Sequence, residues 1–409
     1  MKIKSIMMFI IILLLLLFPG NVFAETQELE LKSNTAILLD VHSGNILYNK
    51  NANTKIYPAS LTKLLTAIVV VENTDLNNIV TVTSSAVNKV EYGYVTADLK
   101  PDEQLTVEQL LNIILIASSN DASIVLAEYI AGSEENSASL MNEKANEIGC
   151  LNSNFTNSNG LHEESHYTTA YDLALISKYF CENQTLFNIS RKTRYTLPIT
   201  NKHNCERTFA TTNEFIDQTN QNGYYYQYAS GLKTGYTTPA GYCLSTLAES
   251  KGLALIAVVV GAENNADRYE DCKSLFKYGF SNFTLKSFGK SGDCIQTISI
   301  ENGSAETRNL DLILTQEISI ALPNEVSISS IDSNIVLKDN LKAPIKKGDI
   351  VGSFNYVIGS STYSVDLVAG SDVKATYLYI RIVFLVALFL VLVGLFFLKK
   401  SLKNVKTEN

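Results

Sequence analysis

The stretch Pro58-Ala59-Ser60-Leu61-Thr62-Lys63 decides how this chain of 409 residues is interpreted. The apolar spacing from Leu61 to Val71 predicts a helix, so Ser60 and Lys63 stand three residues apart at its start and share one face. A serine hydroxyl is a weak nucleophile until a base takes its proton, and a neutral lysine one helical turn away can be that base. The stretch therefore predicts a nucleophile beside its base.

A lysine can serve as a base only if its pKa is depressed. Burial, the positive end of a helix dipole and a second nearby cation all lower the pKa of a lysine. The motif Lys233-Thr234-Gly235 offers such a cation. Because a Ser-x-x-Lys pair alone is more often part of a solvated helix surface, its meaning depends on the other motifs of the chain.

A second polar cluster, Ser118-Ser119-Asn120, separates two helical segments. The preceding segment, Leu110–Ala117, is apolar on nearly every side, and Thr106 with Gln109 forms a capping box before it. Ala122–Ile130 has the pattern of another helix. We expect the first helix to run through the core and the cluster to form the break between the two.

Strands at both ends of the first 280 residues, with helices between them, predict an α+β fold in which helices cover one sheet assembled from distant segments. The expected strands and the last helix are Ala36–Leu39 and Ile46–Tyr48 around the turn His42-Ser43-Gly44-Asn45, Tyr242–Leu247 and Leu253–Val260 around Lys251-Gly252, and Arg268–Tyr278. Short alternating runs such as Ile295–Ile300 and Ser353–Ile358 then predict a smaller all-β domain over residues 283–370.

The three motifs occur in the order Ser-x-x-Lys, Ser-x-Asn and Lys-Thr-Gly, which is the signature of penicillin-binding proteins and class A β-lactamases. Over Thr35–Phe280 the chain resembles the serine D-Ala-D-Ala carboxypeptidases among the low-molecular-mass penicillin-binding proteins. The resemblance implies their DD-peptidase fold, an antiparallel sheet flanked by helices, over residues 25–282. The matching segments are Tyr57-Pro-Ala-Ser-Leu-Thr-Lys63, Ser119-Asn-Asp-Ala122, Asn159-Gly-Leu161, His166-Tyr-Thr-Thr-Ala-Tyr-Asp172 and Gly231-Leu-Lys-Thr-Gly-Tyr-Thr237.

The resemblance also implies which residues act on the substrate. Ser60 would be the acylated nucleophile and Lys63 its general base. Ser118 and Asn120 would bridge to Lys63 and to the substrate amide, and Ser118 would relay a proton to the departing D-alanine. The middle residue, Ser119, replaces the commoner Gly or Asp, which we expect to be tolerated because only the flanking side chains are asked to point inward.

The third motif is implied to bind the substrate. Lys233 and Thr234 would hold the terminal carboxylate, which a fixed cation and a hydroxyl suit physically. Gly235 would let the backbone approach the substrate closely. The backbone N–H groups of Ser60 and Tyr236 would form the oxyanion hole. Elsewhere, Asp102 stands where relatives usually have Gly, which points to an altered loop.

The function so implied is that of a serine D-alanyl-D-alanine carboxypeptidase, which removes the terminal D-alanine from peptidoglycan stem peptides through an acyl-enzyme on Ser60. β-Lactams, as mimics of the dipeptide, would acylate the same serine and inhibit the enzyme. Neither a metal nor an organic cofactor is expected. The all-β domain resembles the family's C-terminal domain more weakly, through Leu341-Lys-Ala-Pro-Ile-Lys-Lys-Gly348 and Val351-Gly352, and carries no identified chemistry.

Both ends of the chain carry membrane signals. Residues 1–24 combine Lys2 and Lys4, a run of 13 apolar residues and Val22-Phe23-Ala24, which is typical of a secretory signal peptide. Near the other end, residues 378–398 include 17 uncharged residues from Ile382 onward and predict a transmembrane helix.

Lysines in the tail, residues 399–409, predict a cytoplasmic C-terminus. We therefore expect a catalytic domain outside the cytoplasm, tethered to the cell membrane by a single span. The formal net charge of -8 becomes -14 between Glu25 and Thr376, with no long basic run. This charge argues against nucleic acid as a partner.

Three other interpretations stay open at this stage. His162-Glu163-Glu164-Ser165-His166 fits the His-Glu-x-x-His zinc motif but lacks apolar flanks and an evident third ligand. A serine β-lactamase would need a glutamate to direct a water, and no Glu-x-x-x-Asn segment is seen. A non-catalytic cell-wall scaffold of the same fold is disfavoured because every catalytic side chain is present.

The six cysteines follow no regular spacing, and the sequence cannot choose among the 15 pairings that six cysteines allow. A domain of this size does not need disulfides, so we expect most of these thiols to be free core residues. The cysteines are Cys150, Cys181, Cys205, Cys243, Cys272 and Cys294.

Overall fold

The structure is a computed structural model that describes residues 29–358, 361–376 and 378–405. The predicted signal peptide, residues 1–24, lies outside this range. Two compact units divide the chain. Of the described residues, the first unit contains 29–37, 48–246 and 257–277, and the second contains those from 278 onward together with 38–47 and 247–256.

The main sheet has five strands in the order β2-β1-β9-β8-β7, so that strands from the two ends of the first 280 residues are neighbours. Its hairpins β1–β2, β7–β8 and β8–β9 have connections of five residues or fewer, which only antiparallel pairing permits. Both predicted hairpins are therefore confirmed. The strands are β1 (Thr35–Asp40), β2 (Ile46–Lys50), β7 (Ala229–Thr237), β8 (Gly241–Ser250) and β9 (Leu253–Ala262).

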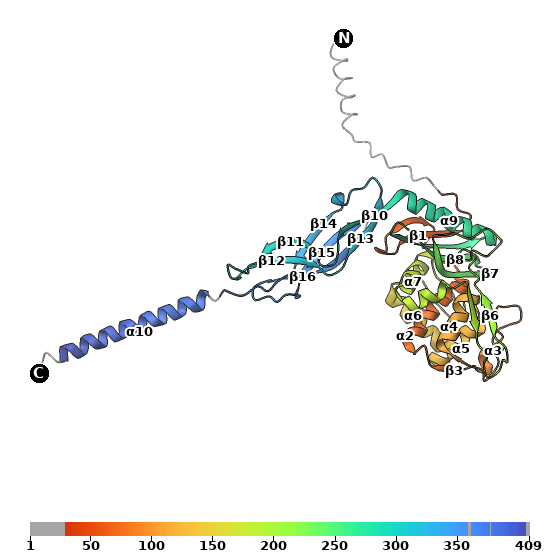
Figure 1. Ribbon diagram of the computed structural model, residues 1–409, viewed down its shortest axis with the longest axis horizontal. Helices are drawn as coiled ribbons and strands as arrows, with labels where there is room; N and C mark the ends of the chain where they lie inside the picture. The colour runs from red at the N-terminus through yellow and green to blue at the C-terminus, as the bar shows by residue number, and fades with distance from the viewer. Residues whose placement is uncertain (1–28, 359–360, 377, 406–409) are drawn as a thin grey trace, which may run out of the picture. The chain divides into compact units, whose positions relative to one another are not determined.

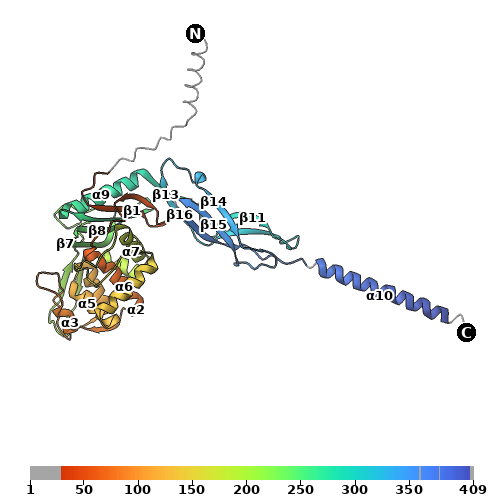
Figure 2. The ribbon, with the colours of Figure 1, turned by 180° about the vertical axis from the view of Figure 1, so that it is seen from behind.

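Helices lie on both sides of this sheet, with α9 on one side and the cluster around α2, α5 and α7 on the other, as Figure 1 and the reverse view in Figure 2 show. The prediction of a sheet covered by helices is thus confirmed. The helices are α2 (Thr62–Asn73), α3 (Ser84–Asn88), α4 (Val107–Asn112), α5 (Asn120–Ala131), α6 (Glu134–Ile148), α7 (Ala170–Glu182), α8 (Gln184–Ser190) and α9 (Asn265–Asn282). Two short hairpins complete this region: β3 (Ile79–Thr81) with β4 (Gln104–Thr106), and β5 (Arg194–Leu197) with β6 (Arg207–Ala210).

The start and the end of the helical segment before Ser118 have clear local causes. The side chain of Thr106 accepts from Gln109 N and the side chain of Gln109 accepts from Thr106 N, which is the predicted capping box. The segment does not stay regular, because α4 passes into a π-helical turn over Ile113–Ala117. Ser118 then adopts the left-handed conformation with φ 63°, so the chain turns there and α5 begins at Asn120.

The second unit contains the predicted β-rich region. Its largest sheet has the order β11-β12-β16-β15-β14, and β10 pairs with β13 in a separate ladder. Alternate residues of β12, Leu310, Leu312 and Leu314, are buried in its apolar core with Val351 and Leu367. The strands are β10 (Phe283–Gly289), β11 (Cys294–Ser299), β12 (Asn309–Leu314), β13 (Ile318–Pro323), β14 (Ser333–Leu337), β15 (Ile350–Ile358) and β16 (Ser361–Ala369).

The last element is helix α10 (Leu378–Val405). Within the part of the chain that the structure describes, no helix satisfies both the length and the hydropathy required of a membrane span. The transmembrane helix expected over residues 378–398 is therefore not confirmed and stays a prediction.

The six cysteines, all of which lie in the described ranges, form no disulfide, and four of them are buried as expected. Cys205 and Cys294 are exposed. Burial raises the pKa of the Cys181 and Cys243 thiols to about 12, which keeps them protonated and unreactive at neutral pH.

A thiol titration tests this arrangement. A colourless disulfide reagent should react quickly with two thiols of the native protein and with six after unfolding in denaturant without a reductant. The Cys205→Ser, Cys294→Ser double variant should show almost no fast reaction. Fewer than six thiols in the unfolded protein would reveal a disulfide and contradict the structure.

Candidate active site

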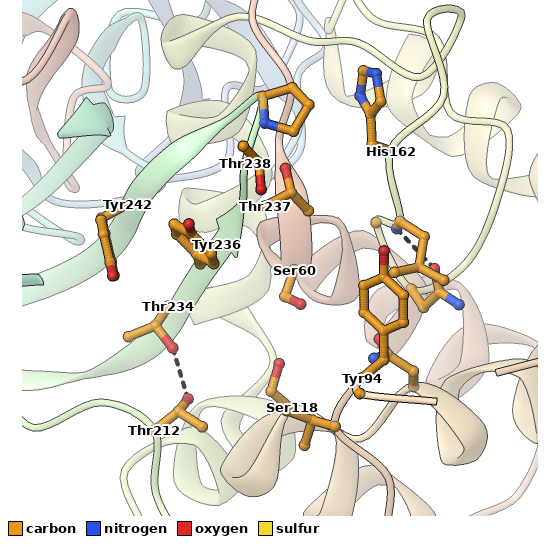
Figure 3. Close-up of a pocket in the computed structure, with 18 of the residues that line it drawn as sticks. Ser60, Tyr94, Ser118, His162, Thr212, Thr234, Tyr236, Thr237, Thr238 and Tyr242 are labelled. Carbon is orange, nitrogen blue, oxygen red and sulfur yellow. Dashed lines mark hydrogen bonds between the residues drawn. The ribbon is translucent and has the colours of Figure 1, made fainter. Parts of the chain in front are cut away.

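A cavity of about 790 Å³ opens in the first unit, where the predicted motifs meet (Figure 3). Six of the eight predicted site residues line it, and the other two, Lys63 and Lys233, are buried behind its wall. The six are Ser60, Ser118, Asn120, Thr234, Gly235 and Tyr236.

Ser60 lies in a 3-10 turn, Ala59–Leu61, that leads directly into α2. The Lys63 amine is 2.9 Å from the Ser60 hydroxyl, 2.8 Å from Asn120 Oδ1 and 2.6 Å from the carbonyl oxygen of Asn159. Burial lowers the pKa of Lys63 to about 7, and the negative charge of Asp121 opposes that shift. A large neutral fraction of Lys63 is therefore present near neutral pH.

The left-handed turn at Ser118 presents the second motif to the cavity. Ser118 and Asn120 line the cavity, and Figure 3 shows the Ser118 side chain directed toward Ser60. Ser119 is fully buried on the other side, where its hydroxyl donates to Asp121. This confirms the expectation that only the two flanking side chains of the motif face the site.

The third motif lies on β7. Lys233 is 1% exposed, and its amine donates to the carbonyl oxygen of Thr234. The side-chain hydroxyl of Thr234 lies 2.6 Å from the hydroxyl of Thr212 (Figure 3). Burial, with repulsion from Lys63 and Arg268, lowers the pKa of Lys233 well below its usual value. Of the causes expected to lower the pKa of Lys63, burial is confirmed as the leading one, whereas the repulsion between the two lysines acts on the pKa of Lys233.

Two glycines allow the backbone segments of the site to come together. A Cβ on Gly235 would lie 3.1 Å from Ser60 N, so β7 passes close to the backbone nitrogen expected in the oxyanion hole. Gly160 has φ +83°, and a Cβ there would lie 1.9 Å from the Ala59 carbonyl oxygen. The segment that carries the Asn159 carbonyl can thus reach Lys63 only because residue 160 is glycine.

Several residues of the site were missed at the level of sequence. Arg268 lines the cavity, is 7% exposed, and donates from Nη1 to the carbonyl oxygens of Gly235 and Cys243, each at 3.2 Å. The sequence marks Arg268 only as a residue of a helix, and only the fold shows that it faces the site. Asn159 belonged to a matching segment but had no assigned role, and Thr212 carried no signal at all.

The zinc interpretation of His162–His166 is wrong. The segment is irregular rather than helical, so the two histidines do not share a helix face. His166 Nδ1 accepts from Thr156 N at 3.0 Å and Nε2 is 2.9 Å from the Thr62 hydroxyl, so both ring nitrogens are engaged. Burial lowers the pKa of His166 to about 4, and the neutral ring serves as a structural bridge.

The glutamates of that segment also lack the position that a β-lactamase mechanism would require. Glu163 and Glu164 are exposed and do not line the cavity. One carboxylate oxygen of Glu163 accepts from the Asn157 side chain instead.

Comparisons with known proteins identify the family of the chain. A family model described as D-alanyl-D-alanine carboxypeptidase matches residues 21–264, and one described as the C-terminal domain of penicillin-binding protein 5 matches residues 283–375. The D-alanyl-D-alanine carboxypeptidase DacF of Bacillus subtilis is 33% identical over 350 residues, which cover 83% of this chain and 87% of DacF. DacC of Escherichia coli, another D-alanyl-D-alanine carboxypeptidase, is 31% identical over 360 residues, 85% of this chain and 86% of DacC.

Comparison with a solved structure leads to the same protein family. Penicillin-binding protein 5 from Haemophilus influenzae superimposes with a TM-score of 0.70 at 28% identity, and the match covers 85% of this chain and 99% of that protein. The fold is therefore that of the DD-peptidases, with a sheet flanked by helices and a C-terminal all-β domain. The chain belongs to the D-alanyl-D-alanine carboxypeptidase family.

Gly160→Ala tests the close approach at the nucleophile. The new methyl group would collide with the Ala59 carbonyl and displace Ser60 or the Asn159 carbonyl, so we expect acylation by a fluorescent penicillin to slow about 100-fold. Gly132→Ala is the matched control, because Gly132 has a similar φ of +80° but open space around it. Equal acylation rates in the two variants would contradict the close approach.

Proposed function

We propose that this protein is a serine D-alanyl-D-alanine carboxypeptidase whose nucleophile is Ser60, acting on peptidoglycan stem peptides. One observation carries the proposal: the buried amine of Lys63 lies 2.9 Å from the Ser60 hydroxyl. A neutral amine has two N–H donors and one lone pair. Asn120 Oδ1 and the Asn159 carbonyl oxygen can only accept, so they engage both N–H groups and leave the lone pair for the Ser60 proton.

The chemistry then follows as acyl transfer in two steps. Lys63 takes the proton of Ser60 while Oγ attacks the carbonyl carbon of the penultimate D-alanine, and the backbone N–H groups of Ser60 and Tyr236 receive the developing oxyanion. Ser118 relays a proton to the amine of the departing D-alanine as the C–N bond breaks. Water then attacks the ester, and its hydrolysis returns the proton to Ser60.

The terminal carboxylate of the substrate would bind at the other end of the cavity. The Thr234 hydroxyl would donate to it, Arg268 would supply positive charge from the cavity lining, and Lys233 would supply it from behind the wall. A bound carboxylate would also raise the pKa of Lys233 again, because an opposite charge favours the protonated amine. A β-lactam, which carries a comparable carboxylate beside its reactive amide, would bind in the same way and acylate Ser60.

Ser60→Ala tests the nucleophile. Both the release of D-alanine from a D-Ala-D-Ala peptide and labelling by a fluorescent penicillin should be abolished, since no other hydroxyl can replace Oγ beside Lys63. Ser84→Ala, at an exposed helix position, is the control and should keep both activities. Hydrolysis that continues in Ser60→Ala would rule out the serine mechanism.

A non-catalytic scaffold of the same fold is the other candidate function. It would bind stem peptides without releasing D-alanine even in the wild-type protein, so the same assay separates the two. The arrangement around Lys63 favours the enzyme, because a purely binding protein gains nothing from a buried neutral lysine beside a serine hydroxyl.

We further propose that the chain is exported through residues 1–24 and anchored in the cell membrane by residues 378–398, with the basic tail 399–409 in the cytoplasm. The support is the sequence pattern of both ends, the helical conformation of Leu378–Val405 and the exposure of its apolar side chains between Ile382 and Phe397. Apolar side chains without a protein cover are suited to lipid.

Deletion of residues 377–409 tests the anchor. We expect the truncated protein to be soluble without detergent and fully active, because every proposed site residue lies before Thr376. The full-length protein should resist extraction by carbonate at alkaline pH, as a spanning helix does. Release of the full-length protein by carbonate would contradict the span.

A further inference from the structure

Residues 91–99 form a wall of the cavity. Two carboxylates that are buried on the side of this wall away from the cavity accept hydrogen bonds from its backbone or from the residue that follows it. Glu91, Tyr94 and Val95 line the cavity. The carboxylates behind the wall are those of Asp121, which is 2% exposed, and Glu103, which is fully buried. Neither carboxylate lines the cavity or has a role in the proposed reaction.

Asp121 connects this wall to the second catalytic motif. Its carboxylate accepts from the backbone nitrogens of Ala97 at 3.0 Å and Leu99 at 3.2 Å, and also from the Ser119 hydroxyl. One residue earlier, Asn120 N donates to the Val95 carbonyl oxygen at 2.9 Å. The turn that presents Ser118 and Asn120 to the substrate is therefore tied to the wall through Asp121.

Asp121 also lies in electrostatic reach of the general base. Its negative charge raises the pKa of Lys63 against the effect of burial. In the described part of the chain, the other titratable groups found to interact with Lys63 are Lys233, from β7, and the neutral His166. Of Asp121, Lys233 and His166, Asp121 is thus the group that favours the protonated form of the Lys63 amine.

Glu103 supports the same wall indirectly, through Lys100 at its end and through Arg207. Its carboxylate accepts from Lys100 N at 3.0 Å and from the Thr200 hydroxyl at 2.8 Å, and it forms an ion pair with Arg207. Arg207 in turn donates to the Ala97 carbonyl oxygen at 2.9 Å. Since its charge is paired, Glu103 provides a matched control for the purely structural part of the role of Asp121.

We propose that Asp121 is a positioning residue that ties the cavity wall to the Ser118–Asn120 turn and so holds Asn120 Oδ1 against the amine of Lys63. The proposal rests on the function proposed above. A general base works best when its pKa lies near the working pH, and the negative charge of Asp121 opposes the fall in the pKa of Lys63 that burial causes. Asp121 limits this fall in the pKa of Lys63 without contacting the substrate.

The test is the rate of single-turnover acylation by a fluorescent penicillin, followed between about pH 5 and pH 9. It compares the wild type with Asp121→Asn, Glu103→Gln and Ser119→Ala. Because a first-order rate reports only on molecules that react, a fraction of misfolded protein does not change the midpoint of the pH profile. Melting temperatures measured alongside show how far each substitution destabilises the fold.

In Asp121→Asn the loss of negative charge lowers the pKa of Lys63, so the midpoint of the profile should move to lower pH by about half a unit or more. The plateau rate should also fall, by up to about three-fold for a shift of half a unit, because the base is weaker. Glu103→Gln should slow acylation at subsaturating penicillin while its midpoint stays at the wild-type value. Ser119→Ala keeps the carboxylate and removes a donor to it, so its midpoint should stay in place or move to higher pH.

The proposal is overturned if Asp121→Asn loses rate equally at every pH with an unmoved midpoint, which is the result of a structural role alone. A shift of Glu103→Gln equal to that of Asp121→Asn would also overturn it. Should Asp121→Asn yield no folded protein, a Ser119→Ala midpoint below that of the wild type decides against the proposal. A wild type that is never acylated, or acylation that survives Ser60→Ala, refutes the proposed function instead.

Discussion

The two acceptors that engage the amine of Lys63, Asn120 Oδ1 and the carbonyl oxygen of Asn159, are the contacts on which the rest of the site depends. They come from the second motif and from a segment 96 residues beyond Lys63, and together they turn the lone pair of the neutral amine toward Ser60. An exposed lysine with an ordinary pKa would be protonated and would have no lone pair to offer. Burial by the fold is therefore a direct requirement of the chemistry.

The segments around Lys63 and Ser60 pack closely enough to bury the amine of Lys63. Helix α2 is buried along nearly its whole length, and residues 158 and 159 pack against it because Gly160 allows the chain to pass the Ala59 carbonyl. On the other side, β7 approaches Ser60 through Gly235. Two buried basic side chains, Lys233 and Arg268, lie close together near the cavity, and a substrate carboxylate would favour the protonated form of Lys233.

Local pattern was enough to predict much of this arrangement. The spacing of Ser60 and Lys63, the capping box at Thr106 and the hairpins of the main sheet all follow from neighbouring residues, and the structure contains each of them. Other features depend on contacts between distant segments. The π-helical turn before Ser118, the bridge made by His166 and the inward position of Arg268 have no local signature, because ordinary helical or loop residues look the same in sequence.

Lys63 is expected to lose its proton near pH 7, far below the ordinary range of lysine, and this titration can be observed directly. Lysine labelled with carbon-13 at Cε reports its charge by NMR, and a Lys63→Arg variant assigns the signal. We predict a midpoint near pH 7 for Lys63 in the free enzyme. A signal that stays that of a charged amine up to about pH 10, the ordinary range of lysine, would contradict it.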